Sequence, residues 1–221
     1  MVGFWERNPG HPLVVVAIPY SPLTPVTTDW VISLMNLQMP PHTRVQFQRG
    51  VPIDVSRNTL VRSAQEHKAS YIFFLDADVL PPPDIILRLM AWKLPIISGV
   101  YWSKKGWPAV WEQHPSGRGF TPIAHLPARG LTEVAGISMG CSLVDMRVFS
   151  CIPDPWFEWR LRDPRKEGEG EGHSEDLDFC EKASQHGFKL YVDPEIRCLH
   201  ETVIPVNVEG EMRFTDAQRE K

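Results

Sequence analysis

The chain has 221 residues, of which 43% are hydrophobic and 23% are charged, the composition of an ordinary globular protein with enough sequence for one large core. Its net charge of -4 provides no basic surface, which disfavours nucleic acid as a main partner. The longest apolar runs, LVVVAIP and YIFFL, are too short to span a bilayer, and no N-terminal leader with a cleavage site is visible. We therefore expect a cytoplasmic protein without a membrane span.

The four cysteines are dispersed among apolar neighbours, and none belongs to a CxxC pair. Zinc sites and disulfide frameworks both use cysteines in recurring spacings. We therefore interpret Cys141, Cys151, Cys180 and Cys198 as reduced thiols of the core, as is usual in a cytosolic protein.

Strands and helices are predicted to alternate along the first half of the chain. Residues 13–18 and 71–75 are apolar on both faces, which indicates strands buried in the middle of a sheet. Such alternation is typical of a parallel α/β sheet. The expected strands cover residues 13–18, 43–48, 71–75 and 96–100, and the expected helices cover residues 27–37, a segment capped by Asp54 and Ser56, and a segment that starts at the prolines 81–83.

From about Gly106 the chain is divided into shorter pieces by tryptophan, proline and glycine. RDPRKEGEGEG, residues 162–172, is charged, rich in glycine and without periodicity, which predicts a mobile loop. A helix is expected to start at Ser174 and to stop at Gly187, because serine favours the N-cap and glycine favours the position after a helix. The other expected pieces are short strands near residues 109–113, 133–135, 142–144, 188–192 and 197–200.

The first candidate site is Asp76-Ala77-Asp78, which directly follows the buried strand YIFFL. At the carboxyl end of a strand in an open sheet, such carboxylates can hold Mg²⁺ or Mn²⁺, which prefer hard oxygen ligands and are shared with substrate phosphates. The structural alternative is a strand-to-turn boundary at which the carboxylates only cap the following backbone. The motif by itself does not separate these two interpretations.

The second candidate site is the start of the late helix, where Glu175 and Asp176 follow Ser174. One of these carboxylates can face a cleft as a general base, and closure of the loop at residues 162–172 would seal the cleft from water. The structural alternative is that acidic residues are favoured in the first turn of any helix.

Three further segments contain candidate residues. In CLHE, the imidazole of His200 is a suitable ligand for Mn²⁺ beside a carboxylate, and a structural histidine is the alternative. In SRN, Arg57 is a candidate partner for a phosphate, with Asn58 beside it, and a surface arginine with a turn asparagine is the alternative. Gly136 and Gly140 indicate close approach of the backbone to a ligand or to another strand.

Taken in this order, the segments resemble the glycosyltransferases of the GT-A fold, and most of all the large inverting family 2. The matching segments lie between about residues 13 and 201 and read VVVAIPYS, SRN, FFLDADV, MGCSLVDMRVF, HSEDLDFCEKASQHGFKLYVDP and CLHE. The resemblance implies an α/β protein of GT-A fold, with a mixed, mainly parallel central sheet flanked by helices. It also implies a single domain over residues 1–221, with a Rossmann-like nucleotide-sugar-binding half at 11–105, an acceptor and catalytic half at 106–203 and a tail at 204–221.

The activity that the resemblance implies is metal-dependent transfer of a sugar from a nucleoside-diphosphate donor, a UDP- or GDP-sugar, to a hydroxyl group of a saccharide, lipid or protein glycan. The implied cofactor is Mn²⁺ or Mg²⁺, held by Asp78 and His200, with Asp76 at the metal or the ribose. Asp176 is the implied catalytic base, with Glu175 beside it. The residues implied at the nucleotide and the sugar are Pro19, Tyr20, Ser21, Arg57, Asn58, Asp76, Ala77 and Gly140.

Other interpretations stay open. SRN and the late histidine are similar to features of retaining GT-A enzymes that use GDP-mannose, so the sequence leaves the stereochemical outcome undecided. The QxxRW pattern of processive synthases is missing, so polymer extrusion is not expected. In other classes, a haloacid dehalogenase-type phosphatase also places DxD after an apolar strand, but here the pair follows two strand-helix units, and Val79 stands close to where a threonine is usual. A nucleotidyltransferase shares the layout and the metal, but PYSPLTP lacks its glycine-rich, basic loop. The 8 tryptophans suit a non-catalytic sugar-binding module.

Overall fold

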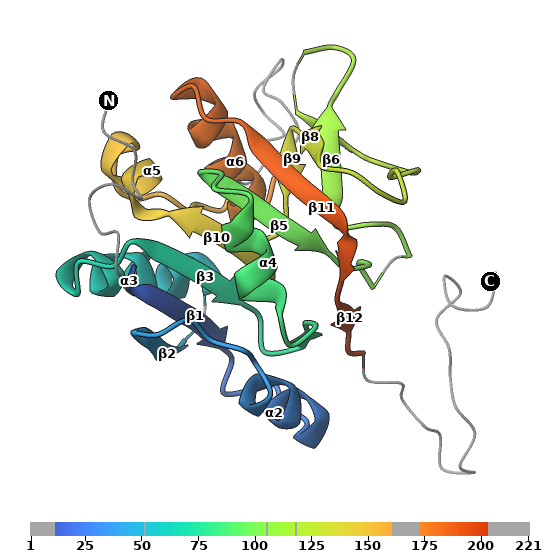
Figure 1. Ribbon diagram of the computed structural model, residues 1–221. Coiled ribbons are helices and arrows are strands. Elements are labelled where there is room, and N and C mark those ends of the chain that lie inside the picture. The colour runs from blue at the N-terminus through green and yellow to red at the C-terminus, as the bar shows by residue number, and fades with distance from the viewer. Residues whose placement is uncertain (1–11, 51, 105, 118, 161–172, 203–221) are drawn as a thin grey trace, which may run out of the picture.

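The computed structural model describes residues 12–50, 52–104, 106–117, 119–160 and 173–202 (Figure 1). A seven-stranded sheet runs through the molecule, and in spatial order its strands are β2 (Thr43–Arg49), β1 (Val14–Tyr20), β3 (Tyr71–Leu75), β10 (Cys141–Asp145), β5 (Ile96–Val100), β11 (Leu190–Arg197) and β8 (Thr132–Val134). β1 pairs in parallel with β2 and β3, and β5 pairs in parallel with β11. β10 is antiparallel to both of its neighbours, and β8 is antiparallel to β11. The predicted fold class, an α/β protein with a mixed, mainly parallel sheet, is confirmed.

Helices cover both faces of this sheet. They are α2 (Thr28–Met35), α3 (Ile53–Glu66), α4 (Ile85–Ala91), α5 (Met146–Cys151) and α6 (Glu175–Gln185). In β1, Val15 and Ala17 belong to one core cluster and Val14 and Val16 to the other, as the two-residue period of a strand requires. Apolar residues of α3, α5 and α6 complete the first cluster, and those of α2 and α4 complete the second.

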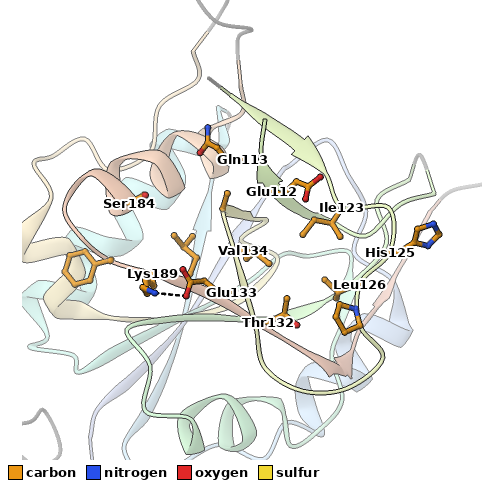
Figure 2. Close-up of a pocket in the computed structure, with 14 residues that line it drawn as sticks. Glu112, Gln113, Ile123, His125, Leu126, Thr132, Glu133, Val134, Ser184 and Lys189 are labelled. Carbon is orange, nitrogen blue, oxygen red and sulfur yellow. Dashed lines mark hydrogen bonds and ion pairs between the residues drawn. The ribbon is translucent and has the colours of Figure 1, made fainter. Parts of the chain in front are cut away.

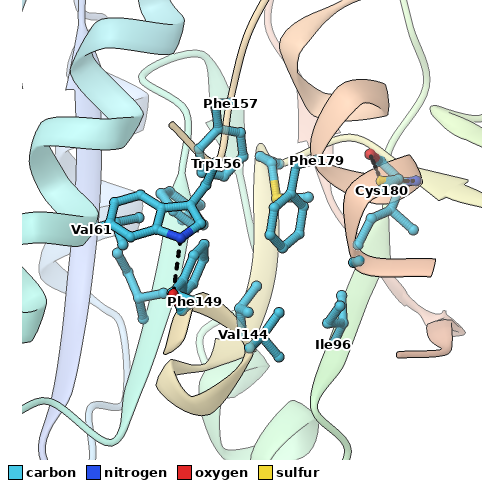
Figure 3. Packing of buried hydrophobic residues seen from close by; sticks show 14 of the residues in the cluster. Val61, Ile96, Val144, Phe149, Trp156, Phe157, Phe179 and Cys180 are labelled. Atoms are coloured by element: carbon cyan, nitrogen blue, oxygen red, sulfur yellow. Dashed lines mark hydrogen bonds between the residues drawn. The ribbon is translucent and has the colours of Figure 1, made fainter. Parts of the chain in front are cut away.

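Four aromatic rings hold α5 and α6 together on the first face (Figure 3). Phe179 of α6 stacks on Phe157 and on Phe149, with ring centroids 4.9 and 5.4 Å apart. Trp156 contacts Phe149 edge-on, and its indole N–H donates to the carbonyl oxygen of Phe149 at 3.0 Å. Because burial of an aromatic ring contributes roughly 2–3 kcal/mol, this cluster helps to hold α6 against α5.

The start of α3 differs from the prediction, whereas the end of α6 agrees with it. We expected Asp54 and Ser56 to cap α3, but the helix begins directly after Pro52, and both residues lie inside its first turn. Pro52 itself occupies the N-cap position, and Oδ1 of Asp54 accepts the N–H of Val55 at 2.9 Å from within the first turn. Gly187 follows α6 with a φ of 81°, as predicted for a residue after a helix end. Within the described part of the chain, every helix falls short of the length and apolarity needed to cross a membrane.

Two smaller sheets complete the fold. β12 (Leu199–His200) pairs antiparallel with β4 (Val79–Leu80), so the end of the described chain returns to the turn after β3. The other small sheet contains β7 (Phe120–Pro122), β6 (Val110–Gln113) and β9 (Gly136–Ile137), and β9 packs against α6. The first of these sheets joins two sequence motifs that are far apart in the chain.

The strands predicted at residues 71–75 and 96–100 are confirmed without a shift. β11 is longer than the predicted strand at 188–192, and its pairing with β5 shifts register after Val192, next to Pro194. Proline lacks the N–H that a regular ladder needs, which accounts for the irregularity. The loop predicted at 162–172 and the tail at 204–221 lie outside the described residues.

The cysteine prediction is confirmed in part. All four residues are free thiols, and Cys141, Cys180 and Cys198 are buried. Cys151 is exposed, so its placement in the core was wrong. It is the last residue of α5, beyond the positions that this short helix buries against the sheet.

Candidate functional site

The candidate site begins at the acidic turn after β3, at the carboxyl end of a central strand. The backbone N–H of Asp76 donates to the carbonyl oxygen of Gly140 at 3.1 Å. The carbonyl oxygen of Asp76 accepts the indole N–H of Trp30, from α2, at 2.9 Å. These bonds fix the turn between two neighbouring elements, and from it the carboxylates of Asp76 and Asp78 reach different partners.

The pairing of β12 with β4 brings His200 to Asp78. The backbone N–H of Glu201 donates to the carbonyl oxygen of Asp78 at 2.8 Å, which joins the two segments once more. The Nδ1 atom of His200 donates to the carbonyl oxygen of Trp102 at 2.8 Å, so Nε2 is the ring nitrogen directed to the carboxylate. Nε2 lies 3.2 Å from Oδ2 of Asp78. The two side chains are therefore in contact, as predicted.

Two side chains that can carry a positive charge contact the carboxylate of Asp78. Besides His200, the Nζ atom of Lys104 lies 2.8 Å from Oδ2 of Asp78. Burial raises the pKa of Asp78, but hydrogen bonds from His200 and Lys104 lower it more and leave it at about 2. Burial lowers the pKa of His200, but the hydrogen bonds with Asp78 and with the carbonyl of Trp102 outweigh burial and raise it. Asp78 is thus a carboxylate at all physiological pH values.

The chemistry of this pair fits a divalent cation. A carboxylate oxygen and an imidazole nitrogen side by side form a donor set that Mn²⁺ accepts. The hydrogen bond from Nδ1 of His200 to a backbone carbonyl is the outer contact that metal-binding histidines usually make. Lys104 shows that the same carboxylate oxygen already attracts a cation. Asp76 contributes no atom to this pair, because its carboxylate is bound elsewhere.

The carboxylate of Asp76 is bound by Arg57, a buried arginine of α3 with only 2% of its side chain exposed. Its Nη2 atom lies 3.0 and 3.2 Å from the two carboxylate oxygens of Asp76. Its Nη1 atom lies 3.0 Å from Oε1 of Glu175 and also forms an ion pair with Asp176. One guanidinium therefore serves three carboxylates from two different elements. The phosphate contact expected for Arg57 would require it to exchange one of these partners, and it stays a prediction.

Three carboxylates around one cation leave an excess of negative charge in a place with little water. Burial raises the pKa of Glu175, and the opposing attraction of Arg57 only reduces that effect. Glu175 therefore keeps its proton to a higher pH than an exposed glutamate. Among the described contacts of α6, Ser174 makes no side-chain bond at the N-cap, so the acidic first turn is held by Arg57.

Asp176 has a second set of contacts on its other oxygen. Oδ2 accepts the hydroxyl of Ser138 at 2.8 Å and the backbone N–H of Met139 at 3.3 Å. The hydroxyl of Tyr101 donates to Oγ of Ser138 at 2.6 Å. The ring of Tyr101 packs edge-on against the ring of His200, with centroids 5.0 Å apart. Asp176 and the Asp78–His200 pair are therefore parts of one site.

Asn58 lies beside Arg57 in the sequence, but its side chain has a different position. Its Nδ2 atom donates to the carbonyl oxygen of Phe157 at 2.8 Å. Its Oδ1 atom accepts the backbone N–H groups of Trp156 and Phe157 at 3.0 and 3.1 Å. These contacts fix the segment before residue 160 to α3, and the nucleotide contact expected for Asn58 stays a prediction.

The other residues expected at the nucleotide lie at the same edge of the sheet as Asp76. Pro19 and Tyr20 end β1, which pairs in parallel with β3, so the carboxyl ends of both strands are neighbours. The ring of Tyr20 lies edge-on to Phe47, with centroids 6.4 Å apart. Ser21 follows the strand, and its hydroxyl oxygen accepts a backbone N–H at 3.1 Å. Ala77 and Gly140 lie in the acidic turn and directly against it.

Several residues of the site were not found from the sequence: Trp30, Tyr101, Trp102, Lys104 and Ser138. A signal for three of them exists, because YWSK directly follows β5, a parallel-paired strand in the middle of the sheet. The rule that places ligands beyond the carboxyl ends of such strands applies to this segment as well as to the acidic turn. Ser138 lies between Gly136 and Gly140, where close approach of the backbone was expected, and Trp30 carries no such signal.

A second group of possible metal ligands lies on α6 and directly before it. The ligand atoms of His173, Asp178 and Glu181 are all within 4.8 Å of one another. Arg160 forms ion pairs with both carboxylates, and Nζ of Lys182 lies 2.8 Å from Oδ2 of Asp178. Side-chain cations contact this group, as Lys104 contacts Asp78, and the group contains no residue of the acidic turn after β3.

A cavity of about 530 Å³ lies at the other end of α6, away from the acidic first turn (Figure 2). Figure 2 shows Ser184 of α6 and the ion pair of Lys189 with Glu133 among the residues around it. Charged, polar and apolar side chains all line this cavity. The cavity shares no residue with the site of Asp78, His200 and Asp176. Its lining consists of Glu112, Gln113, Ile123, His125, Leu126, Pro127, Thr132, Glu133, Val134, Ala135, Ser184, Phe188, Lys189 and Leu190.

Comparisons with known proteins support the fold. No family model matches the sequence, and no curated protein sequence matches it. The chain is similar to the crystal structure of A197 from STIV, with a TM-score of 0.59 and 17% identity over 90% of this chain and 92% of that chain. It is also similar to GalNAc-T7 solved with UDP, GalNAc and Mn²⁺, with a TM-score of 0.58 and 13% identity over 87% of this chain and 44% of that chain. At these identities the likeness shows the fold alone, and the fold is GT-A-like.

Proposed function

We propose that the chain is a metal-dependent glycosyltransferase, which moves a sugar from a nucleoside-diphosphate donor to an acceptor hydroxyl group. The observation that carries the proposal is the position of Asp78 and His200, 3.2 Å apart at the carboxyl end of β3. The GT-A-like fold supports it, and so does the presence of UDP and Mn²⁺ in the structure of GalNAc-T7.

Asp78 and His200 would hold Mn²⁺ or Mg²⁺, with the donor phosphates as further ligands. When bound, the cation offsets the negative charge that develops on the departing diphosphate, an effect typically worth several kcal/mol. Lys104 makes its ion pair with Asp78 from a half-exposed position. With a cation on Asp78, the ammonium group of Lys104 would be released to pair with a diphosphate oxygen.

Asp176 is the proposed base, which accepts the proton of the acceptor hydroxyl as that oxygen attacks the anomeric carbon. It is the carboxylate joined to the metal-binding pair through Ser138 and Tyr101. Glu175 has its Oε1 atom on Arg57 and a raised pKa, so it acts in this proposal as a neighbour that orients Arg57. A separate base implies an inverting reaction, and a retaining one is the alternative.

The nucleotide is proposed to lie across the neighbouring ends of β1 and β3. Pro19, Tyr20 and Ser21 would line the base and ribose, and Asp76 with Ala77 would lie at the ribose. Asp76 suits this role because Arg57 already fixes both of its carboxylate oxygens in one orientation. Gly140, directly behind the acidic turn, would leave room at the sugar.

A panel of UDP-, GDP- and dTDP-sugars with Mn²⁺ tests the proposal. A ligand at 100 times its Kd adds about 2.7 kcal/mol of stability, which raises the Tm of a chain of this size by roughly 5–10 °C. Asp176→Asn should keep this shift and lose transfer, and Asp29→Asn, at an exposed position of α2, should keep both. NMR of the product anomer separates inversion from retention. The proposal fails if every donor leaves Tm unchanged with and without Mn²⁺.

A further inference from the structure

Tyr101 lies between the two chemical centres of the site. It follows β5 directly and has only 5% of its surface exposed. Its ring packs edge-on against the imidazole of His200 at a centroid distance of 5.0 Å and an interplanar angle of 78°. Its hydroxyl group points the other way along the site, to Ser138, at 2.6 Å. One side chain therefore contacts the proposed metal ligand and the hydrogen-bond network of the proposed base.

The direction of the hydrogen bonds is fixed along this network. The hydroxyl of Tyr101 donates to Oγ of Ser138, so the proton of Ser138 is available for Oδ2 of Asp176, at 2.8 Å. Burial raises the pKa of Tyr101 well above its usual range, which keeps the phenol protonated as a donor. The hydroxyl of Ser142 donates to the carbonyl oxygen of Ser138 at 2.8 Å and holds its backbone in place.

The backbone around Tyr101 leaves this hydroxyl group a tightly bounded space. A Cβ atom on Gly140 would lie 2.6 Å from the hydroxyl oxygen and 2.9 Å from the ring carbon that carries it. Any side chain at that position would displace the phenol from Ser138. Gly140 belongs to the same turn contact as Asp76, whose N–H it accepts.

We propose that Tyr101 is a positioning residue that couples the two centres: its ring fixes the imidazole of His200, and its hydroxyl, through Ser138, fixes the carboxylate of Asp176. This inference rests on the proposed function, because it assigns roles to the proposed ligand and base. A hydrogen bond to an ionised carboxylate favours the charged form. Ser138 therefore orients the carboxylate of Asp176, and Tyr101 keeps the Ser138 hydroxyl turned to Asp176.

Tyr101→Phe tests the hydroxyl, because it keeps the ring on His200. We expect Mn²⁺ affinity to stay within about twofold of wild type and kcat to fall about tenfold, the usual cost of losing an outer contact. Without the Tyr101 hydroxyl, the Ser138 hydroxyl is no longer held toward Asp176, so the pH profile of kcat should differ from that of wild type. Ser138→Ala should give the same changes, and the double variant should add little, since both remove one network. Ser138→Thr keeps the hydroxyl and should restore the profile.

Tyr101→Leu tests the ring, with Mn²⁺ affinity measured by electron paramagnetic resonance as a readout that needs no turnover. We expect affinity to fall about tenfold, because the imidazole loses the surface that orients it. Circular dichroism confirms that the variant is folded, and Tyr191→Phe is the matched control, since its hydroxyl lies 3.4 Å from Glu133 outside the site.

Each outcome decides something different. If wild type binds Mn²⁺ but turns over no donor, the proposed function fails, and equal Mn²⁺ affinity of Tyr101→Leu and wild type would overturn the coupling. If wild type is active, a pH profile of Tyr101→Phe and Ser138→Ala that matches Tyr191→Phe overturns the role of the hydroxyl. If wild type binds no Mn²⁺ at any pH, both inferences fall.

Discussion

Oδ2 of Asp78 and Nε2 of His200 lie 3.2 Å apart, although 122 positions separate the two residues in the chain. Backbone pairing makes this contact, because β12 adds to β4 and Glu201 donates to the carbonyl oxygen of Asp78. The two side chains are thus held together whether or not they attract each other. A site with this backbone support is preorganised for a ligand that both groups can bind.

Asp78→Asn is expected to weaken Mn²⁺ binding at least about tenfold, because the amide that replaces the carboxylate has no charge to offset that of the cation. The fold should persist, since backbone bonds hold the turn. Calorimetric titration with Mn²⁺, with and without a donor, measures the loss. Asp84→Asn is the matched control, because Asp84 has a half-exposed side chain and only a long surface ion pair of 3.9 Å. Equal Mn²⁺ affinity of the two variants would contradict the assignment of Asp78 as a ligand.

Glu175→Gln is expected to change how stability depends on pH. A carboxyl group whose folded pKa is raised contributes stability that is fully present below its unfolded pKa and is lost as pH rises through the folded pKa. Glutamine does not titrate, so the stability of the variant relative to wild type should increase as pH rises from about 4.5, the ordinary pKa of glutamate. Above the folded pKa of Glu175 this difference in stability should level off.

Urea denaturation of both proteins between pH 4 and pH 8 measures this difference. Glu66→Gln, at an exposed position of α3, is the control and should follow the wild-type curve. The opposite result is a loss of stability of Glu175→Gln relative to wild type as pH rises. That result would mean that attraction to Arg57 stabilises the ionised form of Glu175 more than burial destabilises it, which contradicts the prediction.

Asn58→Ala is expected to destabilise the protein by roughly 2–4 kcal/mol, because three backbone groups of Trp156 and Phe157 lose their partner in a buried place. Mn²⁺ affinity should stay the same, since the amide of Asn58 contacts backbone rather than Asp78. Urea denaturation and Mn²⁺ titration measure the two effects. Asn36→Ala, at an exposed position after α2, should change stability by less than about 0.5 kcal/mol. A loss of Mn²⁺ or donor affinity without a loss of stability would favour the nucleotide role instead.

The parallel half of the sheet could be predicted because its signals are local. A run such as YIFFL is apolar on both faces, which fixes it as a central strand whatever its neighbours are. The place of β10 could not be predicted in the same way. CSLVD is equally buried, but no residue within it indicates that it lies between β3 and β5 in the opposite direction. Strand order depends on long-range packing, which a single sequence does not display.

The residues of the site also differ in whether their positions can be predicted from local sequence. The acidic turn could be found because it directly follows the apolar strand YIFFL, and the late histidine because the order of motifs resembles that of a known family. The partners of Arg57 could not, because Asp76 and Glu175 reach it from different elements and SRN itself suggests a phosphate instead. Burial decides here, since a guanidinium removed from water requires carboxylates rather than a transient ligand.

Gly140→Ala is expected to cost about 1–3 kcal/mol of stability, because the new Cβ atom overlaps the phenol of Tyr101, 2.6 Å away at the hydroxyl oxygen. The ring cannot retreat freely, since His200 packs against it on another side. Thermal and urea denaturation measure the cost. Mn²⁺ affinity should fall as well, as the displaced ring disturbs the imidazole.

The double variant with Tyr101→Phe separates steric overlap from any effect of glycine on the backbone. Without the hydroxyl, the nearest atom of the ring to the new Cβ is a carbon at 2.9 Å, so part of the overlap disappears. The cost of Gly140→Ala should therefore be smaller by at least about 0.5 kcal/mol in the Tyr101→Phe background, a coupling typical of residues in contact. If the stability costs of the two substitutions simply add, overlap with the Tyr101 hydroxyl is not the reason for a glycine at position 140. The acidic turn itself then requires the glycine.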